Sequence, residues 1–237
     1  MTTIKFRLFA LFLLGACAAK GTRPHDMAAE AHEAEAESAK ASAAEHAGQY
    51  GPAASETTLR CHAGKGGRVC WSALTNPTAE HLRSAEAMSK LAAEHRAASE
   101  ALRSAEAAAC ADLAAEDRDI SPFAYTADVV AVDALTVTHG AGKTGSIETV
   151  GAVVTVRAVP GLTAEWLQRV VDCHVARAAS LGHAAPGMPD CPLVPAGVSA
   201  KVASTGSGFQ VEIRSADGEA AGEVLARARR LLGPSPE

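Results

Sequence analysis

"GLTAEWLQRVVDCHVARAASLG", residues 161–182, is the stretch that decides the fold. It predicts a helix, because Thr163 can cap the N-terminus, apolar residues recur with helical spacing, and Gly182 ends the pattern. The apolar side of this helix comprises Trp166 or Leu167, Val170, Val171, His174, Ala178 and Leu181. An amphipathic helix must bury such a side against another element, so its neighbours in the sequence define the domain.

Four extended segments flank this helix in two pairs. Residues 128–138 and 148–159 are rich in β-branched side chains and are joined by a loop that contains several glycines. Residues 197–205 and 208–216 form a second pair around a Gly-Ser-Gly turn. Each pair therefore predicts a β-hairpin, one before the helix and one after it.

The end of the chain predicts a second helix. Residues 217–233 have helical spacing, with Asp217 as the N-cap and Gly233 as the stop, and a short tail follows at 234–237. The order β-β-α-β-β-α over residues 119–233 predicts an α+β domain. In such a domain, two helices cover one face of a four-stranded antiparallel sheet.

The N-terminal end has the features of an export signal. Two basic residues precede the apolar run Leu8–Leu14, which is shorter than the ~20 residues of a membrane-spanning helix. The run ends in Leu-Gly-Ala-Cys at residues 14–17, which resembles the lipobox of bacterial lipoproteins. The resemblance implies that a signal peptide, residues 1–16, is removed and that Cys17 becomes the lipidated first residue. The alternative is an ordinary cleaved signal with an incidental cysteine.

The resemblance also implies a location and a partner. Bacterial lipoproteins carry two or three acyl chains such as palmitate, which together hold a protein durably in a bilayer. Ala18, and not Asp, follows Cys17, and the family rule then favours the outer membrane, with the protein facing the periplasm. Loss of residues 1–16 removes two basic residues and shifts the net charge from −5 to −7. An acidic chain without a basic stripe excludes nucleic acid as the expected partner.

The segments between the anchor and the domain have three different compositions. Residues 17–58 are mostly Ala, Glu, His and Ser, which predicts a tether that is partly helical or disordered and has nothing to bury. Residues 59–75 contain Cys61 and Cys70 around a Gly-rich turn, which predicts a disulfide-closed loop in an oxidising compartment.

A long helix is expected next, over residues 76–118. It has a coiled-coil-like apolar seam that is weak, because most of its members are small. At 1.5 Å per residue this helix is long for a compact domain. Part of it is therefore expected to project or to pair with a helix in the tether.

The cysteines Cys173 and Cys191 permit two interpretations. We expect them to form a second disulfide, because an exported protein oxidises its thiols and the Pro-rich loop before Cys191 needs a crosslink. Cys110 would then be left over, although its pairing with another cysteine remains open. The alternative is a copper or zinc site, in which His174, His183 and Met188 join the cysteines as ligands.

No sequence motif indicates catalysis. The loop at residues 138–146 looks superficially like a phosphate loop, but it lacks the first glycine and precedes a strand. The polar stretch "EDRDISPF", residues 116–123, either lines a site or ends a helix before Phe123 and Tyr125 anchor the next segment, and we favour the second interpretation. We therefore expect no enzyme and no cofactor. The expected function is a structural or protein-interaction role in the envelope, with periplasmic copper or zinc binding as the alternative.

Overall fold

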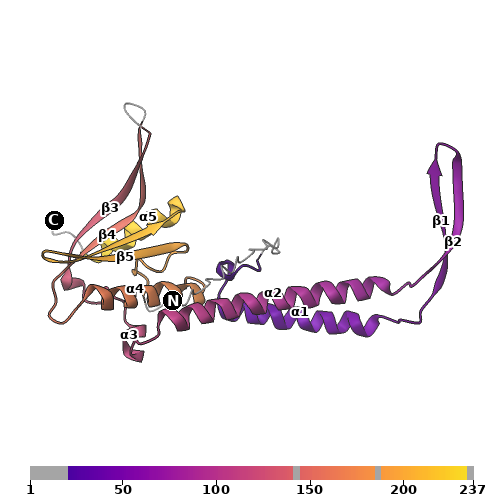
Figure 1. The fold of residues 1–237 in the computed structure, drawn as a ribbon, viewed down its shortest axis with the longest axis horizontal. Coiled ribbons are helices and arrows are strands. Elements are labelled where there is room, and N and C mark those ends of the chain that lie inside the picture. The colour runs from indigo at the N-terminus through magenta and orange to yellow at the C-terminus, as the bar shows by residue number, and fades with distance from the viewer. Residues whose placement is uncertain (1–20, 141–144, 185–187, 234–237) are drawn as a thin grey trace, which may run out of the picture.

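The computed structural model describes residues 21–140, 145–184 and 188–233. It has a mixed α+β fold with two antiparallel sheets, so the predicted class is confirmed. In chain order the elements are η1 (Pro24–Asp26), α1 (Ala29–Gln49), β1 (Glu56–Gly64), β2 (Gly67–Thr75), α2 (Ala79–Ala109), α3 (Ala115–Asp119), η2 (Thr126–Asp128), β3 (Val129–His139), β4 (Ser146–Arg157), α4 (Ala164–Ser180), β5 (Val198–Thr205), β6 (Gly208–Ser215) and α5 (Gly218–Arg230). A sheet-containing domain lies at one end of the molecule, and α1 and α2 carry the β1–β2 hairpin away from it (Figure 1).

The larger sheet has the strand order β3-β4-β6-β5, and every neighbouring pair is antiparallel. Buried residues alternate along the two central strands and stand opposite one another: Ala152 pairs with Ile213, Val154 with Val211, and Val156 with Phe209. Because alternate side chains point to one face, this face carries the core, and α4 and α5 cover it. The fold thus brings both predicted helices onto one side of the sheet.

Helix α4 is buried on two sides. Leu167, Val171 and Ala178 face the core of the sheet. Val170 and Cys173 pack in a separate cluster with residues at the end of α2. Successive helical residues point ~100° apart, so one helix can serve the sheet and a second helix at once.

The end of α4 shows why a glycine is required at residue 182. The N–H of Gly182 donates to Ala179 O and the N–H of His183 donates to Ala178 O, which is the hydrogen-bond pattern of a Schellman motif. Gly182 has φ 66°, and a Cβ there would lie 2.9 Å from atoms of Ala28. The chain just before α1 therefore approaches too closely for any larger residue.

We call the antiparallel pair of α1 and α2 the arm. The expectation that residues 17–58 have nothing to bury is not met, because α1 buries one side against α2. The buried residues of α1 are Ala29, His32, Ala36, Ala39 and Ala43, so this side is almost entirely alanine. The long helix expected over residues 76–118 ends at Ala109, and the short helix α3 follows after a turn. Within the described residues, no helix combines the length and the apolar composition that crossing a bilayer requires.

The segment expected to be a disulfide-closed loop is a β-hairpin. Strands β1 and β2 pair antiparallel, with Cys61 opposite Cys70, and these two residues form a disulfide as predicted. The hairpin lies at the end of the arm that is remote from the α+β domain (Figure 1). The signal sequence, Cys17 and the tail at 234–237 lie outside the described residues.

Candidate functional site

The predicted disulfide between Cys173 and Cys191 is wrong. The structure pairs Cys173 with Cys110, at the end of α2, and leaves Cys191 as a buried free cysteine. The reason lies in the two buried sides of α4. Cys173 is on the side that faces α2, whereas the loop that carries Cys191 crosses the other side, next to the sheet.

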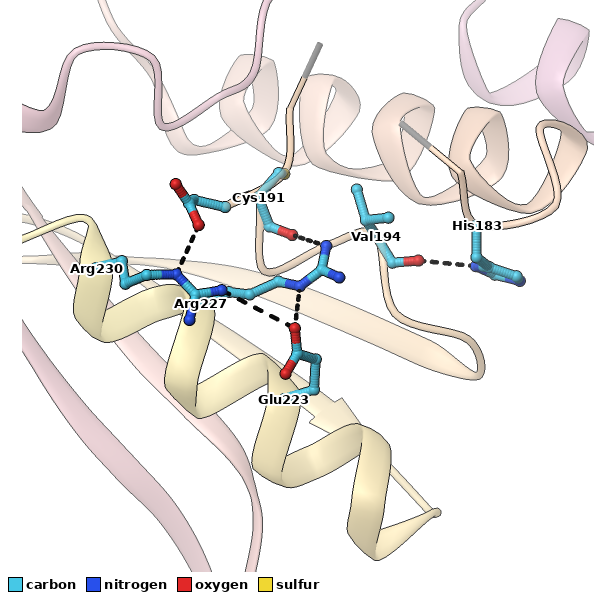
Figure 2. A network of polar contacts seen from close by, with 7 residues as sticks. His183, Cys191, Val194, Glu223, Arg227 and Arg230 are labelled. Atoms are coloured by element: carbon cyan, nitrogen blue, oxygen red, sulfur yellow. Dashed lines mark hydrogen bonds and ion pairs between the residues drawn. The ribbon is translucent and has the colours of Figure 1, made fainter. Parts of the chain in front are cut away.

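Polar contacts hold the loop in place of the predicted disulfide, and Figure 2 shows them. From α5, Arg227 Nη1 donates to the carbonyl oxygen of Cys191 at 3.5 Å, and Arg230 forms an ion pair with Asp190 at 2.6 Å. From the other end of the loop, His183 Nδ1 donates to the carbonyl oxygen of Val194 at 2.8 Å. Pro192, Leu193 and Val194 are buried in the core, so the loop is also anchored by apolar contacts.

This arrangement brings three of the candidate ligands together. His174, Met188 and Cys191 line one small cavity of about 20 Å³ between α4 and the loop. His183 is not among the residues that line it. Of the ligands expected from the sequence, His174, Met188 and Cys191 thus line this cavity, whereas His183 and Cys173 do not.

Burial controls the protonation of two of these groups. Burial lowers the pKa of His174, and this outweighs the opposite effect of hydrogen bonds to the backbone of Ile120 and Asp117. Burial also raises the pKa of the Cys191 thiol, more than the backbone of Leu193, the hydroxyl of Ser121 and the charge of Arg227 lower it. Both groups are therefore neutral at ordinary pH, with the imidazole unprotonated at one nitrogen and the thiol still carrying its proton.

A larger cavity of about 390 Å³ opens beside the 116–123 stretch. Its walls are mainly apolar and include Trp166 and Leu167 of α4, while Asp117, Ser121 and Tyr125 supply polar atoms. Phe123 is buried and anchors the segment as predicted, but Tyr125 is exposed and does not. Ser121 Oγ donates to Cys191 Sγ at 3.6 Å, and no base activates it in the contacts described. The walls therefore suit an apolar group more than they suit acid–base chemistry.

Two histidine pairs join the helices of the arm, and sequence reasoning missed both. Nδ1 of His32 lies 3.0 Å from Nδ1 of His95, and Nδ1 of His46 lies 3.2 Å from Nδ1 of His81. His32 Nε2 also meets the carbonyl oxygen of Arg23 at 3.1 Å. A carbonyl only accepts, so neutral His32 carries its proton on Nε2, and Nδ1 of His95 donates to Nδ1 of His32.

A signal for these pairs exists in the sequence. The histidines of α1 are fourteen residues apart, from 32 to 46, and those of α2 are also fourteen apart, from 81 to 95. Equal spacing on two antiparallel helices allows both pairs to form at once. The two pairs lie ~21 Å apart along the arm, so they cannot share a metal ion.

Among the residues that the structure describes, no three His, Cys, Asp or Glu side chains are placed to hold a metal ion. A site built from those residue types alone is therefore absent from this part of the chain, and any soft-metal site must also use methionine. No protein-family model, curated protein or solved structure matches this chain.

Proposed function

We propose that this protein is a non-catalytic lipoprotein of the bacterial envelope, in which the arm presents the β1–β2 hairpin to an acidic envelope protein. The observation that carries the proposal is the exposure of large apolar side chains on the hairpin. Leu59, Val69 and Leu74 are 70%, 64% and 74% exposed, and Trp71 is 49% exposed. A hairpin of two strands is marginally stable alone in water, and exposed apolar clusters of this kind commonly mark interaction sites.

The exposed residues occupy both faces of the hairpin. Leu59 and Leu74 lie on the face of the Cys61–Cys70 disulfide, and Trp71 and Val69 lie on the opposite face. Each strand of this two-stranded sheet also has one edge without a neighbouring strand. A partner that adds a strand to an open edge would satisfy backbone groups and cover side chains on both faces, which is the mode called β-augmentation.

The charge of the hairpin supports an acidic partner. The hairpin, residues 56–75, contains Arg60, Lys65 and Arg68 against a single acidic residue, Glu56, although the whole chain has a net charge of −5. Opposite charge across an interface speeds association and disfavours wrong partners.

The position of the expected lipid anchor is consistent with this role. Cys17 precedes Gly21 by four residues, which span at most ~14 Å. Pro24 and His25 lie against the domain end of the arm, beside Leu102 of α2. Helix α2 is ~46 Å long, so an anchor at Cys17 would hold the domain near the membrane and leave the hairpin to project.

The test is site-specific photo-crosslinking in cells. A photoreactive residue replaces Val69 on the hairpin or, as the control, Lys90 on the outer side of α2, whose side chain is 76% exposed. We expect Val69 to give one discrete adduct with an acidic envelope protein, identified by mass spectrometry, and Lys90 to give none. Charge reversal in Arg60→Glu/Arg68→Glu should abolish the adduct, and Lys90→Glu should not.

Other outcomes would overturn the proposal. These are an adduct with lipid or with a second copy of the chain, an adduct that survives charge reversal, or equal adducts from both positions. The anchor is tested separately by acyl labelling. Cys17→Ser should abolish the label and release the protein from the membrane fraction, and label that remains would contradict the assignment of Cys17.

A further inference from the structure

Cys191 differs from the other cysteines in the part of the chain that the structure describes. Cys61, Cys70, Cys110 and Cys173 are all in disulfides, whereas Cys191 is free and only 4% exposed. A buried thiol often acts simply as a small apolar side chain. Cys191 is distinguished by the residues that surround its cavity.

The imidazole of His174 provides the second, independent observation. His174 is 4% exposed, and its Nε2 is buried without a hydrogen-bond partner. With its proton on Nδ1, the neutral imidazole of His174 offers a lone pair on this unpartnered Nε2. A buried polar atom without a partner is destabilising, so this nitrogen is available to a ligand. It belongs to a residue that lines the cavity of Cys191.

Met188 adds a thioether to the lining of the same cavity. Sulfur and imidazole ligands together select soft metal ions, above all Cu(I). A cavity of about 20 Å³ has room for one ion or one water and for no larger ligand. We propose that Cys191 Sγ, His174 Nε2 and Met188 Sδ form a site for a single Cu(I) ion.

Charge favours Cu(I) over Zn²⁺ at this site. The thiolate of Cys191 and one Cu(I) ion make a neutral pair, which can be buried at low cost. Binding releases the thiol proton to solvent, and no electrons are exchanged. Zn²⁺ would leave a net positive charge beside Arg177, another lining residue, and normally takes four ligands in a tetrahedral arrangement. Glu106 and Asp119, the acids nearest to Arg177, are already engaged in ion pairs with it.

The fold holds the loop in position for this role. The arginines of α5 fix the backbone on either side of Cys191 through Asp190 and the Cys191 carbonyl (Figure 2). The disulfide Cys110–Cys173 fixes α4 one residue before His174. The two strongest ligands therefore come from segments that are tethered independently of the metal.

The test is competition for Cu(I) with a chromogenic chelator, without oxygen, on the purified mature protein with its disulfides intact. We expect the wild-type protein to remove one equivalent of Cu(I). Cys191→Ser should remove none, and His174→Gln and Met188→Leu should each bind about tenfold or more weakly, as is typical when a metal site loses a supporting group. His62→Gln on β1 and Met88→Leu on α2 are matched controls that should bind as the wild type does.

A second measurement keeps the proposal testable if Cys191→Ser does not fold. Cu(I) should protect Cys191 of the wild-type protein from alkylation during mild unfolding, and X-ray absorption should report sulfur and nitrogen ligands. The proposal is overturned if the wild type binds no copper, if Cys191→Ser keeps its equivalent, or if the control variants lose as much as the site variants do. Each of these results would leave the role of the β1–β2 hairpin untouched.

Discussion

The α+β domain and the arm are both helix-containing structures, but they are stabilised by different means. In the domain, Val154, Val211 and Ile213 are completely buried between the sheet and its helices. In the arm, the buried side of α1 consists of alanines and His32. Burial of a large aliphatic side chain contributes about 1.5–3 kcal/mol, and a methyl group contributes less than half of that. The arm therefore depends more heavily on its polar contacts and on close helix approach.

The β1–β2 hairpin extends this comparison to a third case. It has almost no buried side chains, and its strands contact chiefly each other. The single covalent link Cys61–Cys70 takes the place of a core. The α+β domain is thus stabilised by burial of large apolar side chains, the arm by alanine packing, and the hairpin by a disulfide. The β1–β2 hairpin, which is the most exposed of the three, therefore lies at the end of the arm where a partner could bind.

The largest effect is expected from the link between the domain and the arm. Cys110→Ala/Cys173→Ala should lower the free energy of unfolding by about 4 kcal/mol, because the disulfide closes a loop with a sequence separation of 63. Urea unfolding of the purified mature protein measures this. A decrease of less than about 1 kcal/mol in the free energy of unfolding would show that the disulfide does not stabilise the protein by constraining the unfolded chain.

A slightly smaller effect is expected inside the domain. Ile213→Ala should cost about 3 kcal/mol, because Ile213 is completely buried and its truncation opens a cavity between β6 and the helices. Hydrogen exchange should show the loss in β4 and β6 and leave α1 less affected. If α1 lost protection to the same degree, the domain and the arm would be one cooperative unit and the comparison would fail.

In the arm, His95→Ala should cost about 2 kcal/mol, because it leaves Nδ1 of the buried His32 without its donor. The double variant His32→Leu/His95→Leu is the control. It replaces both partners by apolar groups of similar volume and should recover most of the loss. The measurement is urea unfolding combined with hydrogen exchange in α1. A double variant that is less stable than His95→Ala would rule out this interpretation of the pair.

The smallest global effect is expected at the tip. Cys61→Ala/Cys70→Ala removes a crosslink worth about 2–3 kcal/mol to the hairpin itself by chain entropy. Hydrogen exchange in β1 and β2 should therefore become fast. The unfolding midpoint of the α+β domain should not move, since the hairpin lies at the far end of the arm. A shift of that midpoint comparable to the effect of Cys110→Ala/Cys173→Ala would contradict the separation of the regions.

The comparison also explains how far sequence reasoning reached at the candidate sites. The crosslink between Cys61 and Cys70 could be predicted, because the two residues are close in sequence and flank a turn. The partner of Cys173 could not, because its choice depends on which side of α4 faces α2. The equal spacing of the histidines is visible in the sequence, but the pairs can be identified only when the register of α1 against α2 is known.

The sequence by itself determined the α+β class and the strands and helices of the domain, because periodicity, caps and turn residues act over a few neighbouring positions. Tertiary structure alone decided which sides of α1 and α2 meet, that Cys110 pairs with Cys173, and that Cys191 stays free beside His174 and Met188. These outcomes depend on which surfaces approach each other across long sequence separations. The sequence around an alanine or a cysteine does not indicate which residue it will contact. Only the packed fold sets the distance between each side chain and its partner.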